Sequence, residues 1–514
     1  MDSILITSNK SHEHVILSKT GSPIHWTIFI LYMVVAAYTM VHHELWGDEI
    51  HSWNIAKGSG SFFDLLSNTR YEGHPPIWYV MLWSISKLTH DPVALQFLNL
   101  IISCAIVFII LFYSPFPIII KALIPFGYFF LFEYSILSRN YAIGILIAFC
   151  ICIVIHKDFK KKIAVYYVLL FLLSNTHLLS LLLAVSFHLY FLLKLKEQHK
   201  EYKLLLLHSF IAIVVFLPAV YFIFPPADSS LGTNYWLTRW KSIQLLSIVQ
   251  LPVRAFIPIP LWSEYHFWDT NFLIGTGKLS TFSKWFTLLA SSGLVLLIIF
   301  LLKQNKKSLF FFLFNLLLFV LISFVIPFTN ERHVGFVFIG FLIALWFYSH
   351  SLLISKSQKR IIVLLLSLQV IGGLIAITKD IQHPFSNSYR VNELLKKIPA
   401  GEKIVTDYWC LNTLSAFTDK SYYCVDLQKE ASYLLWNSEL NSALKKDDRY
   451  SSGITAVSKQ DSVNKIYMIS IQRPGKLSQL DGNLYDLFNI KLIDKIEGAI
   501  EKGSDLYLYE ITPK

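Results

Sequence analysis

The stretch IHWTIFILYMVVAAYTMVH (Ile24–His42), followed directly by HELWGDE (43–49), sets the expectation for the whole chain. It carries no Asp, Glu, Lys or Arg, and about 20 such residues form a helix that crosses the hydrocarbon core of a bilayer. The preceding residues are polar and do not lead into a small-residue cleavage site. We therefore expect an uncleaved membrane span that opens onto an acidic pair.

The composition extends this expectation to most of the chain. Of 514 residues, 54% are hydrophobic and only 15% are charged, which is too apolar for a soluble protein of this size. A net charge of +11 could indicate nucleic-acid binding, but lysines and arginines of multispanning proteins gather in cytoplasmic loops. The sequence predicts an all-α polytopic membrane protein, embedded in the lipid bilayer and without a nucleic-acid partner. About eleven transmembrane helices are expected, at 24–42, 93–113, 116–132, 141–156, 163–174, 178–193, 204–224, 282–302, 309–327, 334–354 and 361–378.

Four basic clusters predict the orientation of these spans: KDFKKK (157–162), KLKEQHKEYK (194–203), KQNKK (303–307) and KSQKR (356–360). The positive-inside rule puts all four in the cytoplasm. The N-terminus (1–24) is then cytoplasmic too, provided that HPPIWYVMLWSISKLTH (74–90) lies at the interface as a short helix and does not cross. By parity, the first loop (44–91), the loop 225–281, the turns near 133–141, 174–177 and 329–333, and the tail from 379 are all outside.

Polar residues at these outer turns are unusually varied, with Asp, Glu, His, Arg, Asn and Trp. This favours a ligand site at the outer leaflet. Asp48, beside Glu49, is a candidate general base, although it could equally be a helix N-cap. His74, held extended by the two prolines that follow it, could donate to a phosphate, or could simply begin a helix. His51 is expected to be a bystander.

Three further outer segments carry candidates for phosphate binding. In EYSILSRNYAIG, Arg139 could bind a phosphate in bidentate fashion, or could pair with Glu133 to tie two helices together. SNTH contributes His177, and NERH contributes Glu331, Arg332 and His333. The aromatic-rich loop 225–281 is expected to lie against the membrane as an interfacial helix, with Arg239 and Arg254 as its candidate binding residues.

Some functions lack any supporting motif, because the chain has no Gly-rich phosphate loop, Walker motif or HExxH in a suitable context. Cys104, Cys150 and Cys152 lie in apolar runs and are expected to be buried hydrophobes. The tail (379–514) predicts a small α/β domain outside the membrane, with a helix in 384–399 and strands in 403–409, 420–427, 465–471 and 505–511. Whether Cys410 and Cys424 pair there is left open.

The ordered series WGDE, GHPPIWYVMLWSISKL, EYSILSRNYAIGIL and NTHLLSLLL, within the first 195 residues, resembles the GT-C class of membrane glycosyltransferases. The nearest relatives in that class are the bacterial relatives of protein O-mannosyltransferases and lipid A aminoarabinose transferases. The resemblance implies a GT-C-type transmembrane domain (25–378) with a small extracytoplasmic domain, in a bacterial inner membrane. It also implies transfer of a hexose or pentose, with inversion, from a polyprenyl-phosphate donor to a glycan, lipid or protein acceptor.

The resemblance assigns residues as follows. Asp48 would be the general base, with Glu49 as its catalytic neighbour. The family often has Gln-Glu-Ala directly before this arginine. Here Ile136, Leu137 and Ser138 precede Arg139, so the nearest acidic residue, Glu133, does not stand at the position of the motif's glutamate. A divalent metal near Asp48 and His74 is left open, and no other cofactor is implied. The expected substrate-binding residues are His74, Glu133, Arg139, Tyr141, His177, Arg239, Arg332 and His333.

Two other functions remain open at this point. A flippase or transporter of a lipid-linked saccharide should carry polar residues deep within its spans, whereas this chain keeps them at one end. A lipid-linked polysaccharide polymerase or ligase would share the substrate but not the WGDE and HPP loop. The particular sugar and the acceptor do not follow from the sequence.

Overall fold

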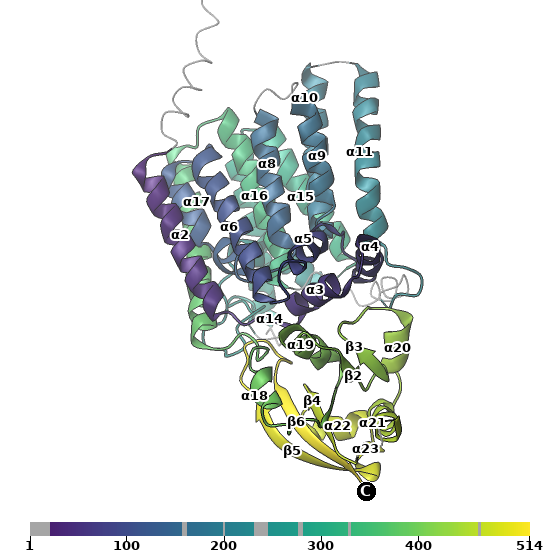
Figure 1. The fold of residues 1–514 in the computed structure, drawn as a ribbon. Coiled ribbons are helices and arrows are strands. Elements are labelled where there is room, and N and C mark those ends of the chain that lie inside the picture. Colours follow the sequence, from purple (N-terminus) through teal and green to yellow (C-terminus); the bar gives the residue numbers. More distant parts are fainter. Residues whose placement is uncertain are drawn as a thin grey trace, which may run out of the picture.

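The protein is seen in a computed structural model that describes residues 21–156, 162–198, 201–230, 245–275, 281–326, 330–460 and 464–514. It consists of a bundle of apolar helices and a smaller domain with a sheet, which lies against one end of the bundle (Figure 1). This confirms the predicted fold of a mostly helical membrane-type chain followed by an α/β domain.

Eight helices of the described residues are long and apolar enough to cross a membrane. Three shorter apolar helices accompany them: α5 (Ile77–Ser86), α8 (Tyr141–His156) and α9 (Ile163–Ser174). The long helices are α2 (Pro23–His42), α6 (Val93–Tyr113), α10 (Leu178–Gln198), α11 (Tyr202–Ile223), α14 (Thr281–Leu302), α15 (Lys306–Ser323), α16 (Glu331–Ser351) and α17 (Lys356–Gln382).

The expected single span at 116–132 is wrong. The chain there breaks into α7 (Ile118–Leu123), a 3-10 turn η2 (Ile124–Phe126) and a π-helical turn η3 (Phe129–Glu133). Pro125 interrupts the helical hydrogen bonding, and α17 passes so close that a Cβ on Gly373 would lie 2.7 Å from the Phe126 carbonyl oxygen. Irregular backbone is tolerated at this depth because protein surrounds it on all sides.

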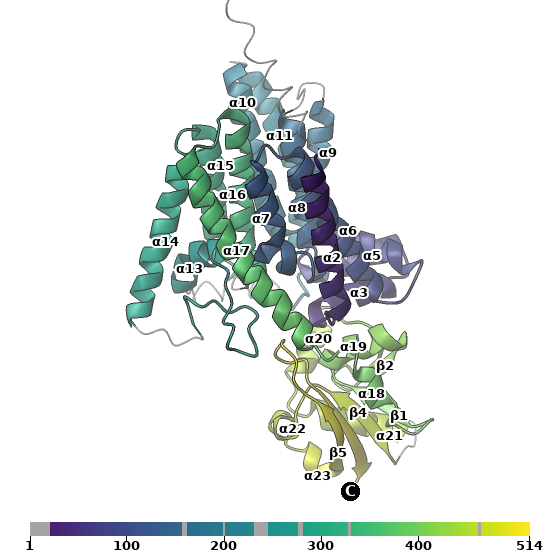
Figure 2. The same ribbon diagram turned by 90° about the vertical axis from the view of Figure 1, so that its left-hand side faces the viewer.

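The first loop folds into short helices at the end of the bundle that faces the α/β domain (Figure 1). These are α3 (Gly47–Gly58), α4 (Phe62–Thr69), the 3-10 turn η1 (Arg70–Glu72) and α5. With 10 residues, α5 is about 15 Å long and too short to cross a bilayer. This agrees with the expected interfacial helix. In the loop 225–281, the described part contains α13 (Leu245–Phe256), which packs against α14 and α16 (Figure 2).

The C-terminal domain is built on a six-stranded sheet in the order β3-β2-β1-β4-β6-β5. β2, β1 and β4 are parallel, and β3, β6 and β5 pair in antiparallel fashion. The four predicted strands are present, whereas β3 and β5 were not expected and the predicted helix 384–399 shrinks to α18. The strands are β1 (Lys403–Thr406), β2 (Tyr422–Cys424), β3 (Lys429–Ala431), β4 (Ile466–Ser470), β5 (Phe488–Ile496) and β6 (Leu506–Pro513).

Helices cover the sheet and join it to the bundle. Cys410 and Cys424 are both buried, and they are not bonded to each other. The helix α19 lies against α3, where the Asn54 side chain donates to the Asn412 carbonyl at 2.8 Å and Lys57 pairs with Asp419 at 2.9 Å. The domain's helices are α18 (Val391–Leu395), α19 (Tyr408–Thr418), α20 (Ser438–Leu444), α21 (Arg449–Gln460), α22 (Pro474–Leu480) and α23 (Leu484–Leu487).

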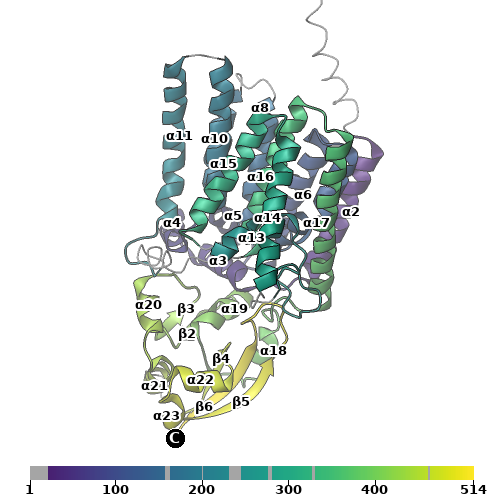
Figure 3. The same cartoon turned by 180° about the vertical axis from the view of Figure 1, so that it is seen from behind.

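The two ends of the bundle differ in character. The connections α14–α15 and α16–α17, which carry two of the basic clusters, lie at the end away from the α/β domain (Figure 2). The view from behind places the tops of α10 and α11 at that same end (Figure 3). The first-loop helices and the α/β domain share the opposite end.

Candidate active site

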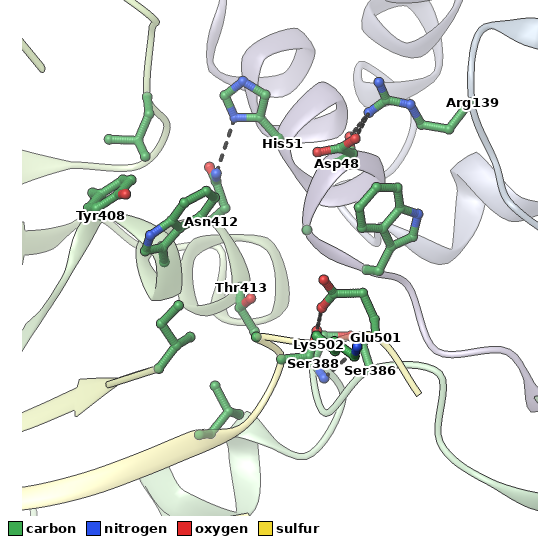
Figure 4. A pocket seen from close by; sticks show the side chains of 18 of the residues that line it. Asp48, His51, Arg139, Ser386, Ser388, Tyr408, Asn412, Thr413, Glu501 and Lys502 are labelled. Carbon is green, nitrogen blue, oxygen red and sulfur yellow. Dashed lines mark hydrogen bonds and ion pairs between the residues drawn. The ribbon is translucent and has the colours of Figure 1, made fainter. Parts of the chain in front are cut away.

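A cavity of about 340 Å³ lies where the first-loop helices meet the α/β domain (Figure 4). The bundle side contributes residues from α3 and from the segments that precede α5 and α8. The domain side contributes residues from α19, the segment after β3, and the β5–β6 hairpin. The lining includes Trp46, Asp48, His51, Glu72, His74, Arg139, Ser386, Ser388, Tyr408, Trp409, Asn412, Thr413, Trp436, Ile471, Glu501, Lys502 and Ser504.

Asp48 lies in the first turn of α3, with 43% of its side chain exposed. One carboxylate oxygen, Oδ2, is 3.6 Å from Arg139 Nη1 and 3.5 Å from Arg332 Nη2, and Arg139 also donates to the Asp48 carbonyl at 2.5 Å. Enclosure in the cavity raises the pKa of Asp48, but the two guanidinium groups outweigh it and hold the pKa below its ordinary value. Asp48 is therefore an ionised carboxylate that binds two arginines.

Arg332 is held behind Asp48 by aromatic rings. Its guanidinium carbon lies 5.0 Å from the centre of the Trp46 ring and 5.4 Å from that of Trp268. Among the described residues, Arg332 Nε and Nη1 and Arg139 Nε are buried donors without a hydrogen-bond partner. Buried N–H groups of this kind usually have an acceptor, so the site is suited to a bound anion.

A cluster of rings lies on one side of the arginines. The His74 ring is centred 4.9 Å from that of His177, which lies 4.7 Å from Tyr141, and His333 is within 5.9 Å of Tyr141. Burial and the nearby Arg139 lower the pKa of His74 to about 3. His74 is thus neutral at physiological pH, and its Nδ1 has no partner among the described residues. Of these four residues only His74 lines the cavity.

Glu49 faces away from the cavity and is fully buried. Its carboxylate accepts from the backbone N–H of Trp46 at 2.9 Å and of Ser138 at 2.5 Å, and it lies 3.4 Å from His43 Nε2. These contacts hold the backbone at Trp46, two positions before Asp48, and at Ser138, immediately before Arg139. Glu49 does not line the cavity.

Two other predicted residues, Glu133 and Arg254, do not line the cavity. Glu133 is buried behind the site, where it accepts from the Tyr128 hydroxyl at 2.9 Å and from the Trp268 indole at 3.3 Å, so it does not pair with Arg139. Arg254 pairs with Glu331 at 2.8 Å and joins α13 to α16. Arg239 lies outside the described residues.

Several lining residues were not anticipated. His51, expected to be a bystander, lies in the lining and bridges Glu72, at 3.0 Å, and the Asn412 side chain, at 3.1 Å. No residue of the α/β domain was predicted as a site residue, although several line the cavity. Glu501 and Lys502 sit in a short polar loop (EKGSD, 501–505) that resembles any hairpin turn, so nothing in the sequence marks them as site residues.

The side chains around Asp48 are better suited to bind an anion than a metal cation. Within the described ranges, no group of three or more His, Cys, Asp and Glu side chains comes together as metal ligands. Asp48 and His74 both face the cavity, but the two guanidinium groups already neutralise Asp48 and would repel a divalent cation bound beside it.

Comparison with known proteins gives few matches. No protein-family model and no curated protein matches the chain. Among solved structures, ArnT from Cupriavidus metallidurans bound to undecaprenyl phosphate is similar, with a TM-score of 0.42 and 9% identity over 95% of this chain and 98% of that one. The apo structure of the same protein gives a TM-score of 0.33 and 10% identity, covering 93% and 97%. Similarity at this level establishes neither family nor activity.

Proposed function

We propose that this protein is a membrane glycosyltransferase that moves a sugar from a polyprenyl-phosphate donor to an acceptor hydroxyl or amine. The observation that carries the proposal is the convergence of Arg139 and Arg332 on Asp48, with buried guanidinium N–H groups left for an anionic ligand. A phosphate monoester or diester supplies the oxygen acceptors that these donors lack. The motif series of the first 195 residues points to the same class of donor.

The position of the cavity supports a lipid-linked donor. The cavity lies at the end of a bundle with many exposed apolar side chains, so a prenyl tail could stay among the helices while its phosphate reaches the arginines. The α/β domain covers the same end of the bundle, and an acceptor would enter there. Among the described residues, Asp48, His74, Arg139 and Arg332 come together at this end, which favours transfer at one surface over passage of a saccharide through the bundle.

The proposed chemistry uses charge and position. Asp48 would hold Arg139 and Arg332 at the donor's phosphate, and these two cations would stabilise the negative charge that grows there as the sugar–oxygen bond breaks. His74, neutral and with a free ring nitrogen, would bind a phosphate oxygen as a donor through Nδ1. Attack by the acceptor from the opposite face of the sugar gives inversion at the anomeric carbon.

The proposed sidedness follows from the two ends of the bundle. We infer that the end with the basic connections is cytoplasmic and that the cavity and the α/β domain are extracytoplasmic, with the N-terminus inside. Cysteine labelling of intact cells tests this: a cysteine at the exposed Asp447 should react with a membrane-impermeant maleimide, and one at Lys356 should react only after lysis. The reverse pattern would contradict the assignment.

The function is tested with Asp48→Asn, which keeps the shape of the side chain but removes its charge. Mass spectrometry should find glycolipids or glycoproteins in cells that make the wild-type protein and lose them, by about 100-fold or more, in the variant. Asp447→Asn, at an exposed position in the α/β domain, is the matched control. If no product depends on the wild-type protein, or if Asp48→Asn makes the full amount while inserted at normal levels, the proposal is wrong.

A further inference from the structure

Three carboxylates line the cavity, those of Asp48, Glu72 and Glu501. Glu72 pairs with His51 at 3.0 Å, and no motif drew attention to Glu501. It lies in the loop between β5 and β6 of the α/β domain, and it enters the cavity below Asp48 from the opposite wall (Figure 4). Lys502, Gly503 and Ser504 of the same loop also line the cavity. The loop is therefore part of the wall of the site and not a distant surface turn.

The loop is fastened at several points. The backbone N–H groups of Ile500 and Glu501 each donate, at 2.9 Å, to the carbonyls of Pro384 and Phe385, which follow α17. His266 Nδ1 contacts the Ile500 carbonyl at 2.8 Å, and Ser504 donates to the Glu501 carboxylate. These contacts hold the backbone of the loop, and the bond from Ser504 orients the Glu501 carboxylate, so the side chain has a defined position, as a reacting group must have.

The surroundings of the Asp48 and Glu501 carboxylates differ. Asp48 binds two guanidinium groups, which stabilise its charge and make it a weak proton acceptor. Among the described residues, Glu501 has no ion pair within 4.0 Å. The charged groups that act on it are Asp48 from α3, Arg332 from α16, and Asp505 from its own loop. Burial and the charge of Asp48 raise the pKa of Glu501 to about 7 despite its hydrogen bond from Ser504.

The side of the cavity that the α/β domain forms is suited to a polar organic molecule. Trp409 and Trp436 present aromatic rings with centres 6.5 Å apart, and Asn412 and Thr413 of α19 supply hydrogen-bonding groups beside them. None of these residues belongs to the arginine cluster. The cavity thus has one side that the bundle contributes, with Arg139 and Asp48, and an aromatic and polar side that the α/β domain contributes.

We propose that Glu501 is the general base of the transfer reaction and that it acts on an acceptor bound against the α/β domain. The proposal rests on the proposed function and moves the task of base from Asp48 to Glu501. An acceptor oxygen or nitrogen forms a bond to the anomeric carbon while the bond to the phosphate oxygen breaks. The electron pair of the broken bond stays on the phosphate, beside Arg139 and Arg332. The acceptor's proton goes to a Glu501 carboxylate oxygen and then to water.

Three variants test this assignment: Glu501→Gln, Glu501→Asp, and the control Glu497→Gln in the same hairpin. Membranes that hold the native acceptors are given a labelled polyprenyl-phosphate sugar, and the rate is followed from pH 5.5 to 9. Donor-side binding is measured separately, as protection of the purified protein against thermal unfolding by undecaprenyl phosphate. Wild-type activity should rise with pH through about 7, because the base must be ionised.

Glu501→Gln should lower the rate about 100-fold or more and abolish this rise, yet bind undecaprenyl phosphate within about twofold of wild type. Glu501→Asp should recover part of the rate and shift the rise in pH, and Glu497→Gln should behave as wild type. Retention of a third or more of the rate by Glu501→Gln, with the pH profile unchanged, overturns the proposal. Absence of transfer by the wild-type protein would instead refute the proposed function itself.

Discussion

Arg332 Nη2 lies 3.5 Å from Asp48 Oδ2, although 284 positions separate the two residues in the chain. The contact joins the first turn of α16 to the first turn of α3, and Arg139, from the segment before α8, reaches the same carboxylate. Three chain segments are thereby tied together at one charge. The arrangement brings two guanidinium groups to one carboxylate, and the Nε and Nη1 atoms of Arg332 and the Nε atom of Arg139 have no acceptor among the described residues.

Arg332→Lys should weaken binding of the donor phosphate even though it keeps the charge. Lysine lacks the planar group that lies beside the Trp46 and Trp268 rings, and it cannot present the two unpaired nitrogen donors Nε and Nη1. We expect at least a tenfold loss of affinity for undecaprenyl phosphate, measured by thermal protection. Arg360→Lys, at the other end of the bundle, is the control. Equal protection of both variants would contradict the role given to Arg332.

Gly335→Ala should damage the site indirectly. A Cβ at this position of α16 would overlap the Tyr134 hydroxyl and lie 2.5 Å from the Phe129 ring, and that hydroxyl donates to the Arg332 carbonyl at 2.8 Å. We expect a cost of about 1–3 kcal/mol and a matching fall in melting temperature and transfer rate. Gly293→Ala in α14 meets nothing within 4 Å and should be neutral or slightly stabilising. Similar melting temperatures for the two variants would argue against the packing described.

His43 should make stability depend on pH. Burial alone would lower the pKa of His43, but Asp380, 3.1 Å from Nδ1, and Glu49 raise it to about 10. A histidine whose pKa is raised on folding stabilises the protein fully below its unfolded pKa of about 6.5, and this contribution is lost as pH rises through about 10.

The melting temperature of the wild-type protein in detergent should therefore fall between pH 7 and 10.5 by several degrees more than that of His43→Gln. His42→Gln changes the neighbouring exposed histidine and should follow the wild-type curve. Parallel curves for wild type and His43→Gln would show that the buried Asp380–His43–Glu49 chain carries no net charge-dependent stability.

Asp48 and Glu49 were predicted together from the acidic pair after the first span, but α3 turns the two side chains in different directions. Asp48 faces the cavity, whereas Glu49 is buried among the backbone N–H groups of Trp46 and Ser138. Adjacent helical residues point about 100° apart, so only one of them could face the cavity.

The sequence by itself determined the class of fold. Ten of the eleven expected spans coincide with single helices, because a run of apolar residues with few charges can be stable only as a helix in lipid or in a large apolar bundle. The exception, 116–132, contains Pro125 and packs directly on Gly373 of α17, and no local sequence pattern predicts that contact. Alternating residues likewise identified β1, β2, β4 and β6.

Only the tertiary structure decided which residues come together at and behind the cavity. Arg332 meets Asp48 because α16 and α3 begin at the same end of the bundle, and Glu501 enters because the β5–β6 hairpin docks on the segment after α17. A short polar loop carries no periodic signal, so its position follows from packing between elements far apart in the sequence. Arg139 and Arg332 could be predicted as candidates because they lie in the turns expected at the outer face. The opposite wall of the cavity depends on how the α/β domain packs against the bundle.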